Sequence, residues 1–207
     1  MTRLAMARVT MLRGQPAEVA NSLEWLEASL RADATPEAIV LLAVPAAVRA
    51  ALAQPDQAAE LLVEIDGNPV SREVPNYPAY LPMMVRTALS LDEPELARRL
   101  VANVESRNPI TEHALATANA ALAETDGDHQ AAADGYADAA QRWQAFAVVP
   151  EQGFAHLGHG RTLLALGRPG DATPVLLQAR DIFTRLQAAP ALTETDALLQ
   201  QATALSS

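Results

Sequence analysis

One short pattern of residue types recurs five times along this chain, and it restricts the possible fold more than any other feature. Each copy is centred on a turn position. Apolar or small residues follow five, nine and twelve positions later, and proline follows two positions later in four of the five copies. The turn positions are Gly14, Ala53, Asp92, Gly127 and Gly167, so successive copies are spaced by 39, 39, 35 and 40 residues. A period of this length predicts helical hairpins stacked in a one-dimensional array.

Each copy has the pattern of a helix, a tight turn and a second helix. A proline just after the turn suits the first turn of a helix, where its missing N–H leaves no partner unsatisfied. Apolar residues five, nine and twelve positions after the turn form one stripe of a helix. We therefore predict helices over residues 2–13, 16–31, 36–52, 55–66, 79–91, 94–106, 110–125, 129–147, 151–166 and 169–187.

A last helix, over 191–205, is expected to cap the array. Its stripe would cover the last hairpin and leave polar residues in water, as the end of a solenoid requires. The stripe comprises Leu192, Leu198, Leu199, Ala202 and Leu205, and the residues expected in water are Thr195, Gln200 and Gln201. The predicted fold class is all-α: a right-handed α-solenoid, in a single domain over 1–207, of hairpins 2–31, 36–66, 79–106, 110–147 and 151–187 plus the cap.

Two segments depart from the repeat. Pro45 falls inside the predicted helix 36–52, which it should kink or split. Residues 67–78 contain three prolines and form the longest connection, so we expect a loop that runs across the surface.

Charge and composition exclude several classes of function. The net charge is −10, every basic side chain among the 15 is arginine, and cysteine is absent. Such a chain is a poor candidate for binding nucleic acid or anionic membrane, because both require a positive field. The alternative is that the excess carboxylates only solvate the outer helix faces. Without cysteine there is no disulfide or thiolate site, which is compatible with a cytoplasmic location.

Neither a secretory signal nor a membrane span is predicted. Arg3, Arg8 and Arg13 interrupt the N-terminal stretch where a signal would need an apolar core. The most apolar run, 38–48, is 11 residues long and too short to cross a bilayer. We expect a soluble cytoplasmic protein.

The spacing of small, turn and apolar residues resembles the tetratricopeptide repeat, although the period exceeds the usual length of about 34 residues. The last copy carries the resemblance best, with Gly160, Leu163, Gly167, Ala172, Leu176 and Ala179. The fourth copy keeps Ala120, Gly127, Ala132, Tyr136 and Ala139.

Residues 110–205 are also similar to the C-terminal repeat region of bacterial LuxR-type ATP-binding regulators and multidomain class III nucleotide cyclases. Segments 165–168, 179–183 and 196–199 carry this similarity. The resemblance implies a repeat scaffold that senses an effector for an attached ATPase.

Candidate binding residues lie six positions before the turns, where three copies have arginine: Arg8, Arg86 and Arg161. In tetratricopeptide-like arrays this position tends to face the concave groove. The arginines could form a ladder for carboxylate or phosphate groups, which arginine binds with two hydrogen bonds. The alternative is that each arginine pairs with a nearby Glu or Asp, or lies over an apolar surface.

Four aromatic residues allow two interpretations. Tyr77 and Tyr80 could line the groove, or could anchor the proline-rich loop against the third hairpin. For Trp25 and Trp143, packing between repeats is a sufficient explanation.

No residue set predicts an enzyme, a metal site or a cofactor. His156 and His159 have a spacing that can present two imidazoles to zinc, but no further ligand completes a site, so a surface or packed pair is expected. Gly158 and Gly160 do not have the spacing of a phosphate-binding loop, and no predicted strand precedes them, so helix packing explains them. No nucleophile–base–acid set is present.

The sequence thus predicts a non-catalytic protein-interaction module whose concave groove binds a peptide or partner domain. This peptide or partner domain can carry acidic groups. The alternative is an effector-sensing C-terminal module of a larger ATP-dependent transcriptional or cyclase regulator. A homodimer is a further prediction, since an uncovered N-terminal end would expose Leu4 and Met11.

Overall fold

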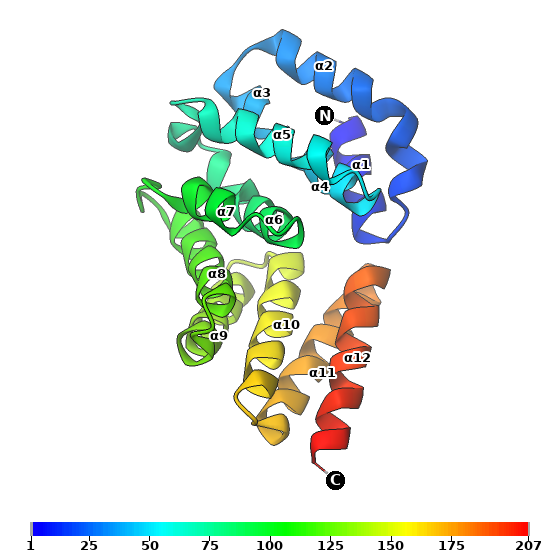
Figure 1. Cartoon of the computed structure of the whole chain (residues 1–207), viewed down its shortest axis with the longest axis vertical. Coiled ribbons are helices and arrows are strands. Elements are labelled where there is room, and N and C mark those ends of the chain that lie inside the picture. The colour runs from blue at the N-terminus through cyan, green and yellow to red at the C-terminus, as the bar shows by residue number, and fades with distance from the viewer. Residues whose placement is uncertain (1, 207) are drawn as a thin grey trace. The chain divides into compact units, whose positions relative to one another are not determined.

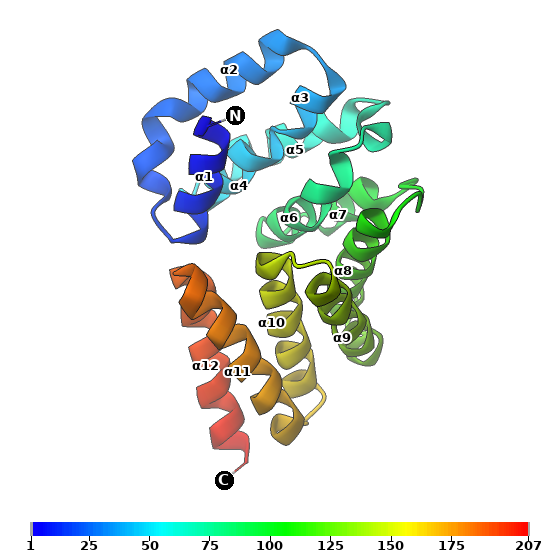
Figure 2. The same ribbon diagram turned by 180° about the vertical axis from the view of Figure 1, so that it is seen from behind.

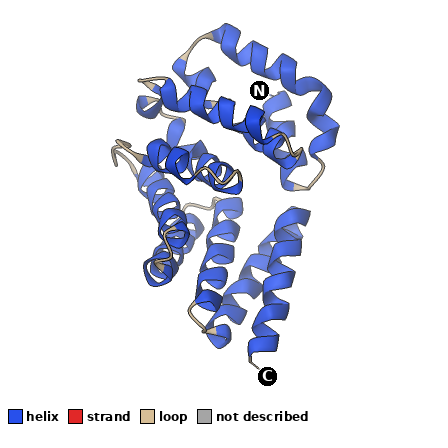
Figure 3. Ribbon diagram, in the orientation of Figure 1, coloured by secondary structure: helices blue, strands red, loops and turns tan. Residues whose placement is uncertain are grey.

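The computed structural model describes residues 2–206, and within them every regular element is a helix (Figure 3). This confirms the all-α prediction. The chain divides into two compact units, one ending at Leu115 and the other beginning at Ala116. We describe each unit by itself, and the single domain over 1–207 stays a prediction.

The first unit contains short and interrupted helices (Figure 1). They are α1 (Thr2–Leu12), the 3₁₀ helix η1 (Pro16–Ser22), α2 (Leu23–Asp33), α3 (Pro36–Val40), α4 (Ala43–Ala51), α5 (Pro55–Gly67), the 3₁₀ helix η2 (Ser71–Glu73), α6 (Tyr77–Ser90), α7 (Pro94–Val101) and the start of α8 (Pro109–Thr125). The second unit has the rest of α8 and the long helices α9 (His129–Ala145), α10 (Val149–Ala165), α11 (Pro169–Leu186) and α12 (Ala189–Leu205).

All five predicted turn positions have the same backbone geometry. Their φ angles lie in the left-handed region, from 56° at Ala53 to 80° at Gly127. In each turn the N–H of this residue donates to the carbonyl three residues before it, and the next N–H donates to the carbonyl five residues before its own position. These paired bonds form the helix-ending Schellman motif, which satisfies carbonyls that the helix leaves open. The repeated turn residues therefore mark helix ends.

The second helix of a copy begins at the predicted proline in four cases. Pro16, Pro55, Pro94 and Pro169 are the first residues of η1, α5, α7 and α11. Pro45 divides the predicted helix 36–52 as expected: α3 ends at Val40 and α4 starts at Ala43. A proline ring clashes with the carbonyl four residues earlier, and this places the break at Leu41.

The first copy does not form the predicted hairpin. Residues 16–22 form the 3₁₀ helix η1, and only 23–33 continue as an α-helix. Helix α1 packs against α4 and η1, while α2 mainly contacts its neighbours in the sequence, η1 and α3. Figure 2 shows α1 beside α4. The outer flanks of α1 and α2 are consequently less covered than in a close-packed pair.

Small residues bring the helices of the second unit together. A Cβ added at Gly158 would lie 2.5 Å from Cζ of Tyr136, and one added at Gly153 would lie 2.8 Å from Cγ2 of Ile182. A Cβ at Gly160 would overlap the side chain of Leu176. Helix packing therefore explains these glycines, as the sequence predicted for Gly158 and Gly160.

The capping helix α12 is present, and its burial follows the prediction in part: Ala202 is buried and Gln200 and Gln201 are exposed, as expected. Thr195, expected in water, is fully buried, and its hydroxyl donates to the carbonyl oxygen of Ala191 at 2.7 Å. Leu205, expected to cover the last pair, is 56% exposed. The buried face consists of small residues because α12 lies close to α11.

Among the described residues, no helix combines the length and apolar character needed to cross a membrane.

Candidate partner-binding surface

Two of the predicted site residues meet in the first unit. The guanidinium carbon of Arg8 on α1 lies 5.4 Å from the ring centroid of Tyr80 on α6. Helix α4 packs against both α1 and α6, and its residue at the repeat position of Arg8 is the small Ala47. Arg8 is exposed and Tyr80 half-buried, so this cation–π pair borders solvent. We call Arg8 and Tyr80 the cation–aromatic pair.

Arg8 also differs from most arginines of the chain in its charge partners. Within residues 3–206, Arg3, Arg8 and Arg13 have no carboxylate at ion-pair distance. Arginines elsewhere form ion pairs with Glu or Asp: Arg31, Arg49, Arg72, Arg98, Arg99, Arg107, Arg142, Arg161, Arg168, Arg180 and Arg185. The unpaired arginines thus concentrate on α1 and the residue that follows it.

Arg161 in the second unit is occupied by internal partners. Its Nε and Nη2 donate to the two carboxylate oxygens of Glu124 at 2.5 and 2.7 Å, and Nη1 donates to Glu194 at 2.7 Å. The hydrogen bonds with Glu124 raise the pKa of Arg161, against the opposite effect of burial. Of the two interpretations of this arginine, internal pairing is the one observed.

Arg86 is half-buried on α6 and already takes part in an interaction within the chain. Since Arg8 and Arg86 belong to the first unit and Arg161 to the second, the ladder of three arginines stays a prediction.

Tyr77 is fully buried at the start of α6 and does not line a surface. Its hydroxyl donates to the carbonyl oxygen of Leu100 at 2.7 Å, near the end of α7, and burial raises the pKa of its phenol. The structure therefore favours the anchoring role for Tyr77 over the groove role.

The proline-rich segment 67–78 is fastened to the same helix end by Arg72, a residue that the sequence did not single out. Arg72 donates to Asp66 Oδ1 at 2.5 Å and to the carbonyl oxygens of Arg99 and Ala102 at 2.7 and 3.0 Å. The last carbonyls of a helix lack helical partners, and Arg72 and Tyr77 donate hydrogen bonds to the carbonyls at the end of α7. The predicted helix 94–106 ends earlier than expected, at Val101.

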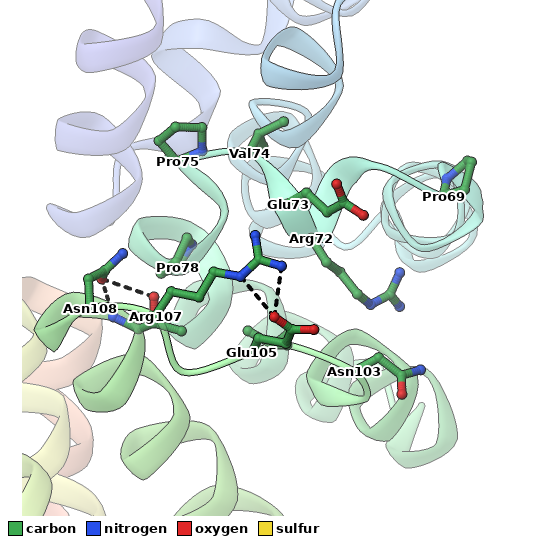
Figure 4. A pocket seen from close by; sticks show the side chains of 12 residues that line it. Pro69, Arg72, Glu73, Val74, Pro75, Pro78, Asn103, Glu105, Arg107 and Asn108 are labelled. Atoms are coloured by element: carbon green, nitrogen blue, oxygen red, sulfur yellow. Dashed lines mark hydrogen bonds and ion pairs between the residues drawn. The ribbon is translucent and has the colours of Figure 1, made fainter.

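A cleft of about 340 Å³ lies between this segment and residues 103–108 (Figure 4). Arg107 extends across it and donates to Glu105 at 2.9 Å, while Asn108 caps α8 by accepting from the backbone N–H of Thr111 at 3.0 Å. The cations of the cleft are thus already paired, and its polar groups mainly hold the loop in place.

His156 and His159 are half-buried neighbours on α10. Burial, and then His159, lowers the pKa of His156. Burial, and then Arg168, lowers the pKa of His159, against a rise caused by Asp134. No three His, Cys, Asp or Glu side chains in the described part of the chain are grouped to hold a metal ion.

The exposed apolar residues of the N-terminal end are not those predicted. Leu4 is buried and Met11 half-buried, whereas Met6, Val9 and Trp25 are 55%, 44% and 54% exposed. The prediction that Trp25 packs between repeats is wrong, because η1 carries α2 away from α1. Trp143 is buried as predicted, and its indole N–H donates to Thr117 Oγ1 at 2.7 Å.

Comparison with solved structures identifies the architecture. The chain is similar to the crystal structure of nearly identical TPR-like repeats from a Podosopora anserina protein described as a kinesin light chain, in a variant with one substitution. The TM-score is 0.50 at 21% sequence identity, over 90% of this chain and 95% of the other. The fold is TPR-like. A second structure of these repeats has a TM-score of 0.49 with the same identity and coverage.

No protein-family model and no curated protein matches the chain. The TPR-like likeness thus concerns the fold, an array that generally presents extended surfaces to protein partners. The finer similarity to LuxR-type regulators and cyclases stays a prediction.

Proposed function

We propose that this TPR-like chain is a non-catalytic protein-interaction module that binds an acidic peptide, or an acidic segment of a partner domain, at the cation–aromatic pair of Arg8 and Tyr80. The observation that supports the proposal is the state of Arg8. Its cation borders solvent, lies over an aromatic ring and has no carboxylate partner within the described residues.

The chemistry of Arg8 favours a carboxylate ligand. A guanidinium offers parallel N–H donors that match the two oxygens of a carboxylate. The ring of Tyr80 supports the guanidinium without using these donors. At Arg161, in contrast, an incoming carboxylate must first displace Glu124 or Glu194.

The acidic character of the remaining chain adds selectivity. With a net charge of −10, the chain as a whole disfavours acidic ligands. An acidic segment should therefore bind at a cation that no carboxylate of the described chain neutralises, and Arg8 over Tyr80 is such a cation.

Selection from a random peptide library displayed on phage tests the proposal. We expect peptides bound by the wild-type chain to be enriched in Asp and Glu, and an Arg8→Gln variant to lose this enrichment. Arg13→Gln removes an equally unpaired charge, just after the end of α1 and away from Tyr80, and serves as the matched control. Selected peptides without acidic enrichment, or equal losses in both variants, would contradict the proposal.

The effector-sensing role implied by residues 110–205 is the second candidate. An upstream ATPase module in the gene product would support it, and the proposed binding surface is compatible with either setting.

A further inference from the structure

We infer that two copies of this chain associate around a twofold axis through a surface formed by α1, η1 and α2. This surface, here called the N-terminal face, comprises the exposed apolar residues Met6, Val9 and Trp25 and the charged residues Arg3, Arg13, Glu18 and Glu24. It is distinct from the cation–aromatic pair and does not rest on the proposed peptide binding.

The apolar part of the N-terminal face lies on one flank of α1. Met6, Val9 and Arg13 are spaced i, i+3 and i+7 and therefore form one stripe, and the Arg13 N–H still donates to the Val9 carbonyl at 3.0 Å. Arg8 points to a different flank by the same helical geometry, toward Tyr80. The stripe is therefore free to contact a partner while Arg8 faces α6.

Trp25 on α2 lies beside Arg3, which precedes Met6 by three positions on α1. The guanidinium carbon of Arg3 lies 4.1 Å from the ring centroid of Trp25 and ties the two helices together. The tryptophan nevertheless remains 54% exposed, close to the exposure of Met6. Exposed large apolar side chains grouped on one end typically mark an interaction surface, whereas scattered ones need no explanation.

The charges of the N-terminal face identify the occupant. Arg3 and Arg13, on and just after α1, have no ion-pair partner within residues 3–206, and neither do Glu18 on η1 and Glu24 on α2. The unpaired cations thus belong to the α1 region and the unpaired carboxylates to η1 and α2. A purely acidic partner would face Glu18 and Glu24 unfavourably.

Twofold symmetry makes this surface complementary to itself. In such an interface the α1 region of one copy contacts the α2 region of the other, and the reverse contact occurs at the same time. Basic α1 then meets acidic η1 and α2 twice, around an apolar centre. A face of one sign would repel its own copy.

The C-terminal helix carries a single large exposed apolar side chain, Leu205 in its last turn, and no apolar stripe for a head-to-tail contact. The outward positions of α12 hold small and polar side chains that are all exposed: Thr193, Ala197, Gln200 and Ala204. A polar outer face of this kind closes a helical array. Because a twofold interface uses the same surface of both copies, association through the N-terminal face should stop at the dimer.

Sedimentation equilibrium over a range of protein concentrations, on the whole chain, tests this inference. We expect a monomer–dimer equilibrium for the wild type. Val9→Asp should raise the dissociation constant by about 30-fold or more, as loss of a central interface residue does. Val63→Asp, at a residue of α5 that is 49% exposed, is the control and should leave the dimer intact.

Charge reversal tests the twofold arrangement itself. Arg13→Glu alone and Glu18→Arg/Glu24→Arg alone should each weaken the homodimer, because both copies then present like charges. An equimolar mixture of these two variants should regain a dimer, since each carries the sign that the other lacks.

Fluorescence gives an independent signal. Trp143 is buried, so acrylamide quenching reports mainly on Trp25 and should fall as the dimer forms. A wild-type monomer at every concentration would overturn the inference. So would a dimer insensitive to Val9→Asp, or variants that do not recover a dimer when mixed.

Discussion

Replacing Gly158 of α10 with alanine measures how closely the helices of the second unit pack. The added Cβ would lie 2.5–2.7 Å from three ring atoms of Tyr136 on α9. Such distances require movement, and the tyrosine ring is only 5% exposed. Its hydroxyl also donates to Glu124 Oε2 at 2.9 Å, so a shift of the ring endangers this hydrogen bond.

Three effects determine the expected change in the free energy of unfolding. Alanine in place of glycine favours a helix interior by about 1 kcal/mol. Overpacking a buried contact costs about 1–3 kcal/mol, and loss of a hydrogen bond to a charged group costs about 1.5–3 kcal/mol. The unfavourable effects exceed the favourable one, and the expected net loss is about 2 kcal/mol. For a chain of this length this lowers the melting temperature by roughly 4–8 °C.

Thermal unfolding followed by circular dichroism measures the effect, with Gly170→Ala as the control. Gly170 also lies in a helix, but a Cβ there has no atom within 4 Å, so we expect unchanged or slightly higher stability. If Gly158→Ala were as stable as the wild type, the close contact between α9 and α10 would be refuted.

Three further predictions concern individual residues. Arg72→Ala should destabilise the chain by about 2–3 kcal/mol in urea unfolding, because the carbonyls of Arg99 and Ala102 lose a donor and Asp66 keeps only Arg99, whereas Arg99→Ala at a 53% exposed side chain should cost under about 1 kcal/mol. Ala53→Gly should stabilise by about 1 kcal/mol, since Ala53 has φ 56°, and a loss of stability would contradict this turn geometry. The pKa values of His156 and His159 are lowered in the folded chain, so the unfolded chain takes up protons at these histidines at a higher pH than the folded chain does. The free energy of unfolding should therefore fall as the pH drops below about 6.5, and a His156→Gln/His159→Gln variant should show a weaker dependence of stability on pH.

The repeat could be predicted from the sequence because its residues act locally. A left-handed residue followed by proline ends one helix and starts the next whatever packs around it, as at Gly167 and Pro169. Small residues such as Gly158 signal close helix contacts for the same reason.

The predictions that proved wrong depend on how residues far apart in the sequence pack against one another. Residues 16–22 have an apolar stripe suited to an α-helix, yet they adopt the 3₁₀ form that connects α1 to α2. Thr195 can be buried because its hydroxyl donates a hydrogen bond to the carbonyl oxygen of Ala191 on the preceding turn. The polarity of the side chain alone does not indicate this.

The site was predicted only in part. The repeat position singled out Arg8 and Arg161 equally, but only the fold shows that Glu124 neutralises Arg161 while Arg8 lies over Tyr80. Helical spacing does place Met6, Val9 and Arg13 on one stripe. That Arg13 and Glu24 lack ion-pair partners within residues 3–206 required the structure.

Titration of a selected acidic peptide against the wild-type, Arg8→Gln and Arg13→Gln chains, by isothermal calorimetry, measures the proposed binding surface most directly. Loss of a charge-assisted hydrogen bond of about 1.5–3 kcal/mol should weaken binding to Arg8→Gln by roughly 10- to 150-fold. Arg13→Gln should bind within about 3-fold of the wild type, as expected for a charge that makes no direct contact. Equal affinity of Arg8→Gln and wild type for the peptide would contradict the assignment of this surface.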